Sequence, residues 1–114
     1  MGAFIITRRH NGALQFNLKA LDGHNILTGE GYSAKTSCLH AIEAVRKQAQ
    51  EQRHFERKVS LKGKWSFQLK AANGLIIGTS EKYDSEEALN QAIASVMQLA
   101  PTAGIEDHSQ HHSV

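Results

Sequence analysis

The sequence predicts an α+β fold in which one antiparallel sheet carries two helices on a single face, with pseudo-twofold symmetry. Two observations predict it. Residues 4–45 align without a gap to residues 55–96, and 14 of the 42 pairs are identical, which indicates two tandem copies of one ββ(β)α unit. Each copy also passes from alternating apolar and polar residues to apolar residues at helical spacing. Two copies are too few for an open solenoid, so we expect a closed pseudo-symmetric domain.

Each copy contains a strand with a turn behind it. Phe16–Ala20 and Phe67–Ala71 alternate between apolar and polar residues, as half-buried strands do. Leu21–Gly23 and Ala72–Gly74 follow directly, and each ends in a glycine suited to a positive φ. A further strand is expected after each turn.

The length of the turn decides which side chains share a face of the sheet. A two-residue loop at Asp22 and Gly23 would place Ile26 on the face opposite Leu18. A three-residue loop, with a type I turn closed by a glycine bulge, places both apolar side chains on one face. We therefore predict the three-residue loop in both copies. The polar side chains then expected to point away from the core are Asn17, Lys19, Gln68 and Lys70.

The second half of each copy predicts a helix. Ser33 and Asp84 are aligned candidates for the N-cap, and Asp84 with Glu87 has the spacing of a capping box. Behind them, apolar residues recur at i, i+3, i+4 and i+7 and predict a buried stripe. These residues are Cys38, Ala41, Ile42 and Val45 in the first copy and Leu89, Ala92, Ile93 and Val96 in the second.

The two copies and their connections account for most of the 114 residues. We expect a single domain over residues 1–107, with repeat one at about 1–54 and repeat two at about 55–107. Leading strands should start near Phe4 and Phe55, and Ala103–Asp107 is a candidate for a short last strand. His108–Val114 is expected to form a disordered tail.

The doubled pattern resembles the YegP-like family of small uncharacterised bacterial proteins. The resemblance rests on Phe-x-Leu-Lys-Ala-x-(Asp/Asn)-Gly-x-x-Ile, then Thr-x-Glu-x-Tyr, then a helix ending Ala-Ile-x-x-Val, in both copies. It implies β3-α-β units that share one sheet and exchange their last strands, so that the tandem chain is a monomeric pseudo-dimer. By this analogy Phe55–Leu61 closes the first unit while opening the second, and Ala103–Asp107 closes the second. Gly29 and Gly31 depart from Ser80 and Lys82 in the other copy. The family implies no activity.

Composition narrows the class of protein. The chain is 40% hydrophobic and 21% charged, which is ordinary for a globular domain. A single cysteine fits a reducing compartment, and the apolar runs are short for a membrane span, so we expect a cytoplasmic protein. The charge is uneven, with a net +5 over Arg46–Lys64 and a net −5 from Glu81 onward. The basic segment indicates either a site for an anionic partner or a helix end and strand whose charges are simply solvated.

No catalytic, cofactor or metal motif is recognisable. His40 is two positions after Cys38, so the two side chains point to different faces of a helix. Because Cys38 aligns with Leu89, we expect it in the core. The seven histidines have no closed metal-binding spacing, although those near the carboxyl end, His108, His111 and His112, are candidates for weak metal binding.

The repeated polar residues are the first candidates for a partner-binding surface. They are expected to form two symmetric groups on or beside the sheet, together with two amides. Their alternative role is structural, because lysines guard exposed sheet surfaces and tyrosines can support the start of a helix. The candidates are Asn17, Lys19, Gln68, Lys70, Glu30, Glu81, Tyr32 and Tyr83.

A basic segment with aromatic residues gives a second hypothesis, nucleic-acid binding, because phosphate-tracking cations and base-stacking rings occur together in it. Phe55 and Trp65 align with Phe4 and Leu14, which indicates core or edge positions instead. The candidates are Arg53, Arg57, Lys58, Lys62, Lys64 and Trp65. We therefore predict a non-catalytic interaction or ligand-binding module with a protein or peptide partner, followed by nucleic-acid binding and then by an enzyme.

Overall fold

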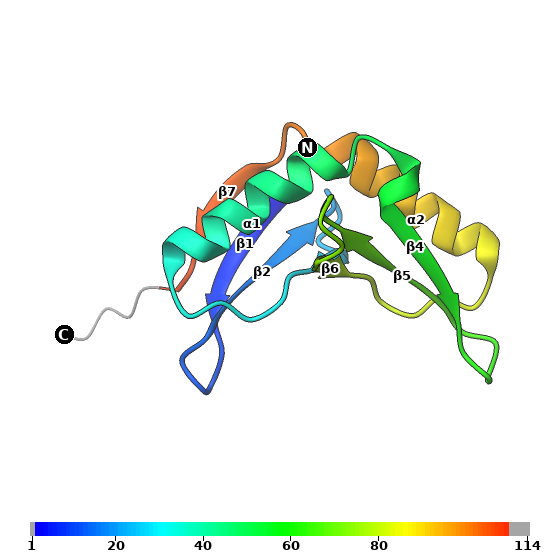
Figure 1. Cartoon of the computed structure of the whole chain (residues 1–114), viewed down its shortest axis with the longest axis horizontal. Helices are drawn as coiled ribbons and strands as arrows, with labels where there is room; N and C mark the ends of the chain where they lie inside the picture. Colours follow the sequence, from blue (N-terminus) through cyan, green and yellow to red (C-terminus); the bar gives the residue numbers. More distant parts are fainter. Residues whose placement is uncertain (1, 110–114) are drawn as a thin grey trace.

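The computed structural model describes residues 2–109. Both helices lie on one face of a single sheet, and the two long hairpins extend away from the helices and diverge toward their turns (Figure 1). The elements in chain order are β1 (Ala3–Arg8), β2 (Leu14–Lys19), β3 (Asn25–Thr28), α1 (Lys35–Gln48), the 3-10 turn η1 (Gln52–His54), β4 (Phe55–Val59), β5 (Trp65–Lys70), β6 (Ile76–Thr79), α2 (Glu86–Leu99) and β7 (Gly104–Asp107).

The sheet has the order β4-β5-β6-β3-β2-β1-β7 and is antiparallel except between β1 and β7. The repeats meet where β3 pairs with β6, and the paired residues there are the aligned Thr28 and Thr79. Aligned core residues have like surroundings, since Leu18 and Leu69 are both fully buried under the helices. The α+β fold with two pseudo-symmetric repeats is therefore confirmed.

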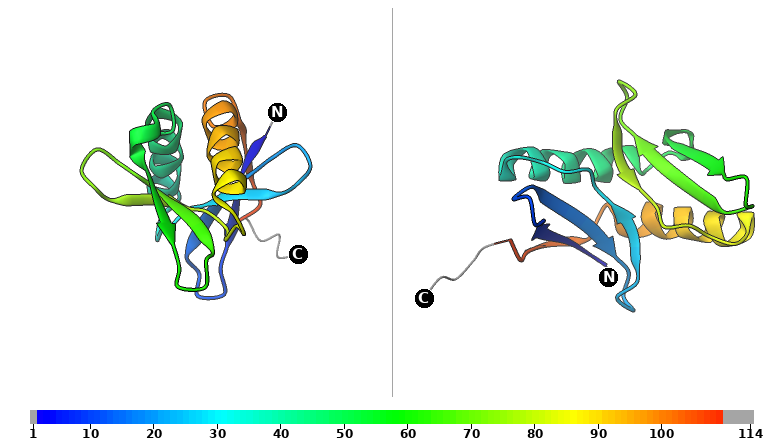
Figure 2. Two further views of the ribbon diagram at one scale, coloured as in Figure 1. Left: turned by 90° about the vertical axis from the view of Figure 1, so that its right-hand side faces the viewer. Right: turned by 90° about the horizontal axis from the view of Figure 1, so that it is seen from below.

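Each helix packs on strands of both repeats, and this makes one core. Helix α1 contacts β2, β5 and β6, and α2 contacts β3 and β5. Seen end on, the two helices lie above the crossing of the hairpins (Figure 2). The predicted apolar stripes are buried in both helices, as the 3.6-residue period requires. The buried residues are Cys38, Ala41, Ile42 and Val45 in α1 and Leu89, Ala92, Ile93 and Val96 in α2.

Both predicted N-caps are wrong by one residue. The caps are Ala34, which makes no side-chain hydrogen bond, and Ser85, whose Oγ accepts from the Ala88 amide at 3.1 Å. The reason is the pairing just before each helix, where Tyr32 and Tyr83 form isolated bridges with β2 and β5. This pairing keeps the chain extended for longer than the local sequence indicates.

The turn after β2 has the predicted three-residue loop. The Gly23 amide donates to the Ala20 carbonyl and the Ala20 amide donates to the His24 carbonyl, both at 2.9 Å. Gly23 has a φ of +84°, in the left-handed region that favours glycine. The second copy repeats this geometry, with Gly74 at +88°.

The pairing of β2 with β3 is irregular just before this turn. It shifts between Leu18 and Lys19, so that Leu27 lies opposite Leu18. The same shift places Gly78 opposite Leu69. Ile26 is nevertheless buried, because the bulge turns an additional side chain toward the core.

Strand β7 leaves repeat two and pairs in parallel with β1 of repeat one. It is therefore exchanged, but it closes the first unit rather than the second, contrary to the expectation for Ala103–Asp107. Strand β4 pairs only with β5 and therefore does not close the first unit, contrary to the expectation for Phe55–Leu61. The outer edge of β1 is already occupied by β7, so β4 is left as an edge strand.

The described part of the predicted tail is attached to the sheet. The His108 amide donates to the Ile6 carbonyl at 2.8 Å, which extends the pairing of β7. Ser109 is buried and donates from its amide to Asp107 Oδ1 at 2.9 Å. His111 and His112 lie outside the described residues.

Candidate functional site on the open face of the sheet

The face of the sheet turned away from the helices, here called the open face, is covered by no helix or strand among residues 2–109. Seen from below, the strands lie in front of both helices (Figure 2). Alternation along the strands decides which side chains point there. In β2 these are Gln15, Asn17 and Lys19, and in β5 they are Ser66, Gln68 and Lys70, all half-buried between buried core residues.

A continuous series of hydrogen bonds, here called the polar chain, crosses the open face of repeat one. The Arg9 Nε donates to Gln15 Oε1 at 2.5 Å, and the Gln15 amide lies 3.4 Å from Asn17 Oδ1. Asn17 Oδ1 also accepts from the Thr28 hydroxyl at 2.9 Å. The polar chain thus begins at a guanidinium beside the β1–β2 turn and reaches β3 at the centre of the sheet.

The polar chain then crosses into repeat two. The Asn25 amide donates to Thr28 Oγ1 at 2.9 Å and to Glu81 Oε1 at 3.2 Å. Because Glu81 follows β6, this last bond links the two repeats across the pseudo-dyad. Asn25 aligns with Ile76, so the side chain that makes the link has no counterpart in the other copy.

Repeat two carries ion pairs on the same face. Lys70 donates to Glu56 at 2.7 Å, and Lys58 lies 3.1 Å from the other oxygen of that carboxylate. The hydrogen bond from Lys70 holds the pKa of Glu56 below its ordinary value. The open face is therefore amide- and hydroxyl-rich in repeat one and ionic in repeat two.

The structure does not bring the eight predicted partner-binding residues together. The open face carries four of them, Asn17, Lys19, Gln68 and Lys70. Glu81 belongs to the polar chain. Glu30, which aligns with Glu81, is exposed.

The two tyrosines are on the other side of the sheet, next to the helices. The Tyr32 ring stacks on Phe16 with centroids 6.2 Å apart, and burial raises the pKa of its hydroxyl. Burial also raises the pKa of Tyr83, whose buried hydroxyl has no partner among the described residues. These positions fit the structural role, supporting the start of each helix.

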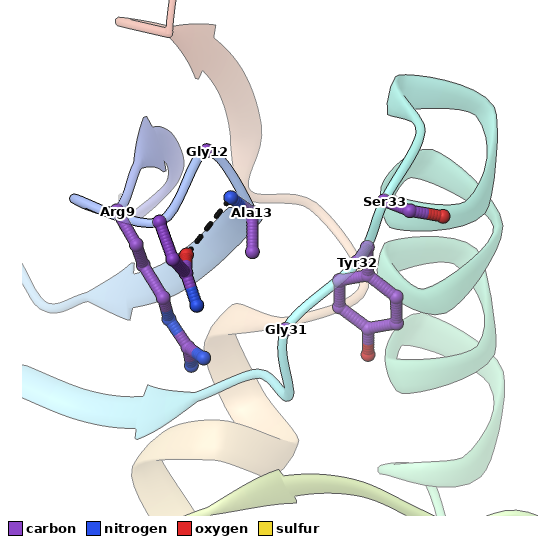
Figure 3. A pocket seen from close by; sticks show the side chains of 7 residues that line it. Arg9, Gly12, Ala13, Gly31, Tyr32 and Ser33 are labelled. Atoms are coloured by element: carbon purple, nitrogen blue, oxygen red, sulfur yellow. Dashed lines mark hydrogen bonds between the residues drawn. The ribbon is translucent and has the colours of Figure 1, made fainter.

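A hollow of about 620 Å³ lies at the Arg9 end of the polar chain. It is lined by the β1–β2 turn and by the segment between β3 and α1. Figure 3 shows Arg9 on one side and the Tyr32 ring on the other, with Gly31 between them. The lining residues are Arg9, Asn11, Gly12, Ala13, Gly31, Tyr32 and Ser33. Most of them differ between the copies, and this difference is the sequence signal that would have identified the hollow.

The predicted nucleic-acid segment is divided between two faces of the sheet. Arg57 extends to Asn90 of α2 on the helix side, at 3.0 Å, whereas Lys58 is on the open face. Arg53 and Lys64 are paired with Glu51 and Asp84.

Of the two other residues in this segment, Trp65 is half-buried against the core and Lys62 is exposed in the turn after β4. Three of the five cations therefore form separate ion pairs, and the five do not lie in one continuous stripe along the chain.

Catalytic groups do not converge in the part of the chain described here. Cys38 is fully buried and burial raises the pKa of its thiol, while His40 is exposed on another side of α1. Residues 2–109 contain no group of three or more histidine, cysteine or acidic side chains placed to hold a metal ion. None of their helices has the length and apolar character needed to cross a membrane.

Comparison with known proteins identifies relatives along almost the whole chain. The UPF0339 protein PA0329 of Pseudomonas aeruginosa is 42% identical over 93% of this chain and 96% of its own length. The UPF0339 protein YegP of Escherichia coli is 35% identical over 95% of this chain and 98% of its own length.

Solved structures share the fold. The solution structure of YegP from E. coli, a protein of unknown function, superposes with a TM-score of 0.92 at 34% identity, covering 97% of this chain and 96% of that one. The UPF0339 protein SO3888 of Shewanella oneidensis gives 0.89 at 36% identity, covering 97% and 98%. These matches confirm the resemblance to YegP-like proteins. Residues 10–56 and 61–107 each match the Domain of unknown function (DUF1508), at the same 51-residue offset as the internal repeat, and the chain therefore belongs to this family.

Proposed function

We propose that the protein is a non-catalytic interaction module that binds a protein or peptide partner on its open face. The observation that carries this proposal is the polar chain, which links both repeats on a face that no described element covers. The amide and hydroxyl side chains of the polar chain are fixed by hydrogen bonds to one another. Binding a partner therefore costs less side-chain conformational entropy. The polar chain also ends in two charged groups, Arg9 and Glu81, which favour one orientation of the partner.

The dimensions of the molecule support a face of this kind. The molecule measures 47 × 27 × 27 Å, so its largest face exceeds the roughly 800 Å² that each partner buries in an interface of standard size. An enzyme would instead need an enclosed pocket with convergent ionisable groups. The hollow beside Arg9 is open and is lined by no carboxylate among the described residues.

The test compares two charge reversals of equal size. The purified chain is immobilised and used to capture partners from a cell extract, with and without nuclease treatment. Lys19→Glu alters the open face, and Lys47→Glu makes the same change at an exposed position of α1. We expect a nuclease-resistant partner whose recovery falls several-fold with Lys19→Glu and stays at the wild-type level with Lys47→Glu.

Two results would contradict the proposal. Equal recovery by both variants would show that the partner does not contact the open face. Loss of all recovery on nuclease treatment would favour the nucleic-acid hypothesis, since binding to phosphates depends on the nucleic acid itself.

A further inference from the structure

The two repeats differ at the place where the hollow opens. In repeat two, Lys64 and Asp84 form an ion pair that joins the β4–β5 turn to the segment before α2. This pair holds the pKa of Asp84 below its ordinary value. The aligned residues in repeat one are Ala13 and Ser33, which carry no charge. The hollow therefore lies where the other copy has its own cation and carboxylate.

A different cation lies at the hollow in repeat one. Arg9 takes the place of Ser60, and its guanidinium is the only ionised group among the described lining residues. Its Nε is engaged by Gln15, and neither of its terminal nitrogens has a hydrogen bond within residues 2–109. These two nitrogens are donors, and a carboxylate can accept from both at once.

The remaining polar groups of the hollow are also suited to an acceptor. Asn11 Oδ1 accepts from the Ala13 amide at 3.0 Å, which leaves the nitrogen of the Asn11 side chain as a donor (the dashed line in Figure 3 is this bond). Tyr32 presents its ring on the opposite side. Negative charge from a ligand would therefore meet donors and no carboxylate of the described lining.

Gly31 is required for this placement of the guanidinium. A Cβ at this position would lie 2.8 Å from Arg9 Nη1, closer than the two atoms can approach. Gly31 is exposed and its φ is not in the left-handed region. A side chain there would displace the flexible end of Arg9 without straining the backbone. Repeat two has Ser60 at the position of Arg9, and it carries Lys82 at the position of Gly31.

We propose that the hollow binds a carboxylate, supplied by an acidic side chain of the partner on the open face. The source of the carboxylate rests on the proposed function, whereas the site itself rests on Arg9, Asn11 and Gly31. The carboxylate takes the place that Asp84 occupies in repeat two. Arg9 anchors it at one end of the polar chain, and the rest of the partner extends along the open face.

The probe is a glutamate blocked at both ends, which carries one carboxylate, and its glutamine counterpart is the neutral control. Binding is measured from the backbone amide resonances in a two-dimensional ¹⁵N NMR titration at constant ionic strength. We expect saturable shifts at residues 9–13 and 31–33 with the glutamate probe alone. Inorganic phosphate is titrated in parallel as the competing oxyanion.

Three variants test the residues. Arg9→Gln should weaken binding by about tenfold or more, because it removes a charge-assisted hydrogen bond. Gly31→Ala should weaken binding at unchanged stability. The double variant Ala13→Lys with Ser33→Asp transfers the ion pair of repeat two into repeat one and should abolish binding in a folded protein. Arg53→Gln removes an exposed cation that does not line the hollow and should leave binding unchanged.

The proposal is overturned if no saturable shift occurs, if the glutamine probe or phosphate produces the same shifts as glutamate, or if Arg53→Gln weakens binding as much as Arg9→Gln. Failure here is distinguishable from failure of the proposed function. Should Lys19→Glu lose the partner while the glutamate probe fails to bind, only the carboxylate site is wrong.

Discussion

Gly29 lies against a buried aromatic ring, and replacing it tests the packing of repeat one. A Cβ at Gly29 would lie 2.2 Å from Phe16 Cε2 and 2.5 Å from Cδ2. Carbon atoms pack at about 3.5–4.0 Å, so the ring would have to move by more than about 1 Å. Phe16 is fully buried between Phe4, in an edge-on contact at 5.9 Å, and Tyr32. The ring therefore has little room to move.

The expected cost follows from two opposing effects. Overpacking a core costs about 1–3 kcal/mol, and the size of this overlap favours the upper half of that range. Replacing a glycine whose backbone conformation alanine can adopt recovers about 0.4–1 kcal/mol of conformational entropy. Gly29→Ala should therefore lower the free energy of unfolding by about 2 kcal/mol. Because Phe16→Leu removes the ring and with it the overlap, Gly29→Ala should not destabilise the protein in that background and should keep only the entropic gain.

The aligned position supplies the matched control. Ser80 Oγ accepts from the Phe67 amide at 2.9 Å, so that Ser80→Ala loses about 1 kcal/mol of hydrogen bonding and creates no overlap. This loss should persist in the Phe16→Leu background. The assay is urea unfolding at equilibrium, with the denaturant slope used to check that unfolding remains two-state. An equal cost of Gly29→Ala with and without the Phe16 ring would refute the reasoning.

Three further predictions concern single contacts. Gly78→Ala should destabilise the fold by about 1–2 kcal/mol in urea unfolding, since its Cβ would lie 2.8 Å from the buried Leu27; an unchanged midpoint would contradict the packing. Ser85→Ala should cost about 1 kcal/mol in thermal unfolding through loss of the α2 cap, and no change in Tm would contradict that cap. The hydrogen bond from Lys35 lowers the pKa of Asp107 to about 2. A carboxyl group with a lowered pKa stabilises the folded state at pH values above its unfolded pKa, and this stability is lost as pH falls through about 2. Lys35→Met should therefore raise the pKa of Asp107 measured by NMR. It should also reduce the loss of folding stability between pH 4 and 2.

Local patterns in the sequence predicted the repeating unit well. The alternation in Phe16–Ala20 placed the polar residues on the open face, and the apolar stripe from Cys38 to Val45 is buried as the helical period requires. The turn at Leu21–Gly23 also has its predicted form. Each of these features depends on side chains within a few residues of one another, so a single copy contains the necessary information. The agreement of two copies then strengthened each prediction.

The candidate site was predicted only in part. Asn17 was recognised as pointing to the open face, but its partners Thr28 and Gln15 became apparent only once β2 and β3 were paired. Sequence repetition draws attention to residues that the copies share. Shared residues such as Tyr32 support the fold, whereas the polar chain depends on residues such as Asn25 that only one copy has.

The sequence by itself determined the elements, their faces and the existence of two equivalent halves, because these depend on neighbouring residues and on their repetition. The tertiary structure alone decided how the halves join: β3 beside β6, β7 in parallel on β1, and β4 left at an edge. It also decided that a hollow opens in one copy and an ion pair fills the other. These arrangements depend on contacts between residues far apart in the chain, whose free energies are settled by competition among alternative pairings and not by any local pattern.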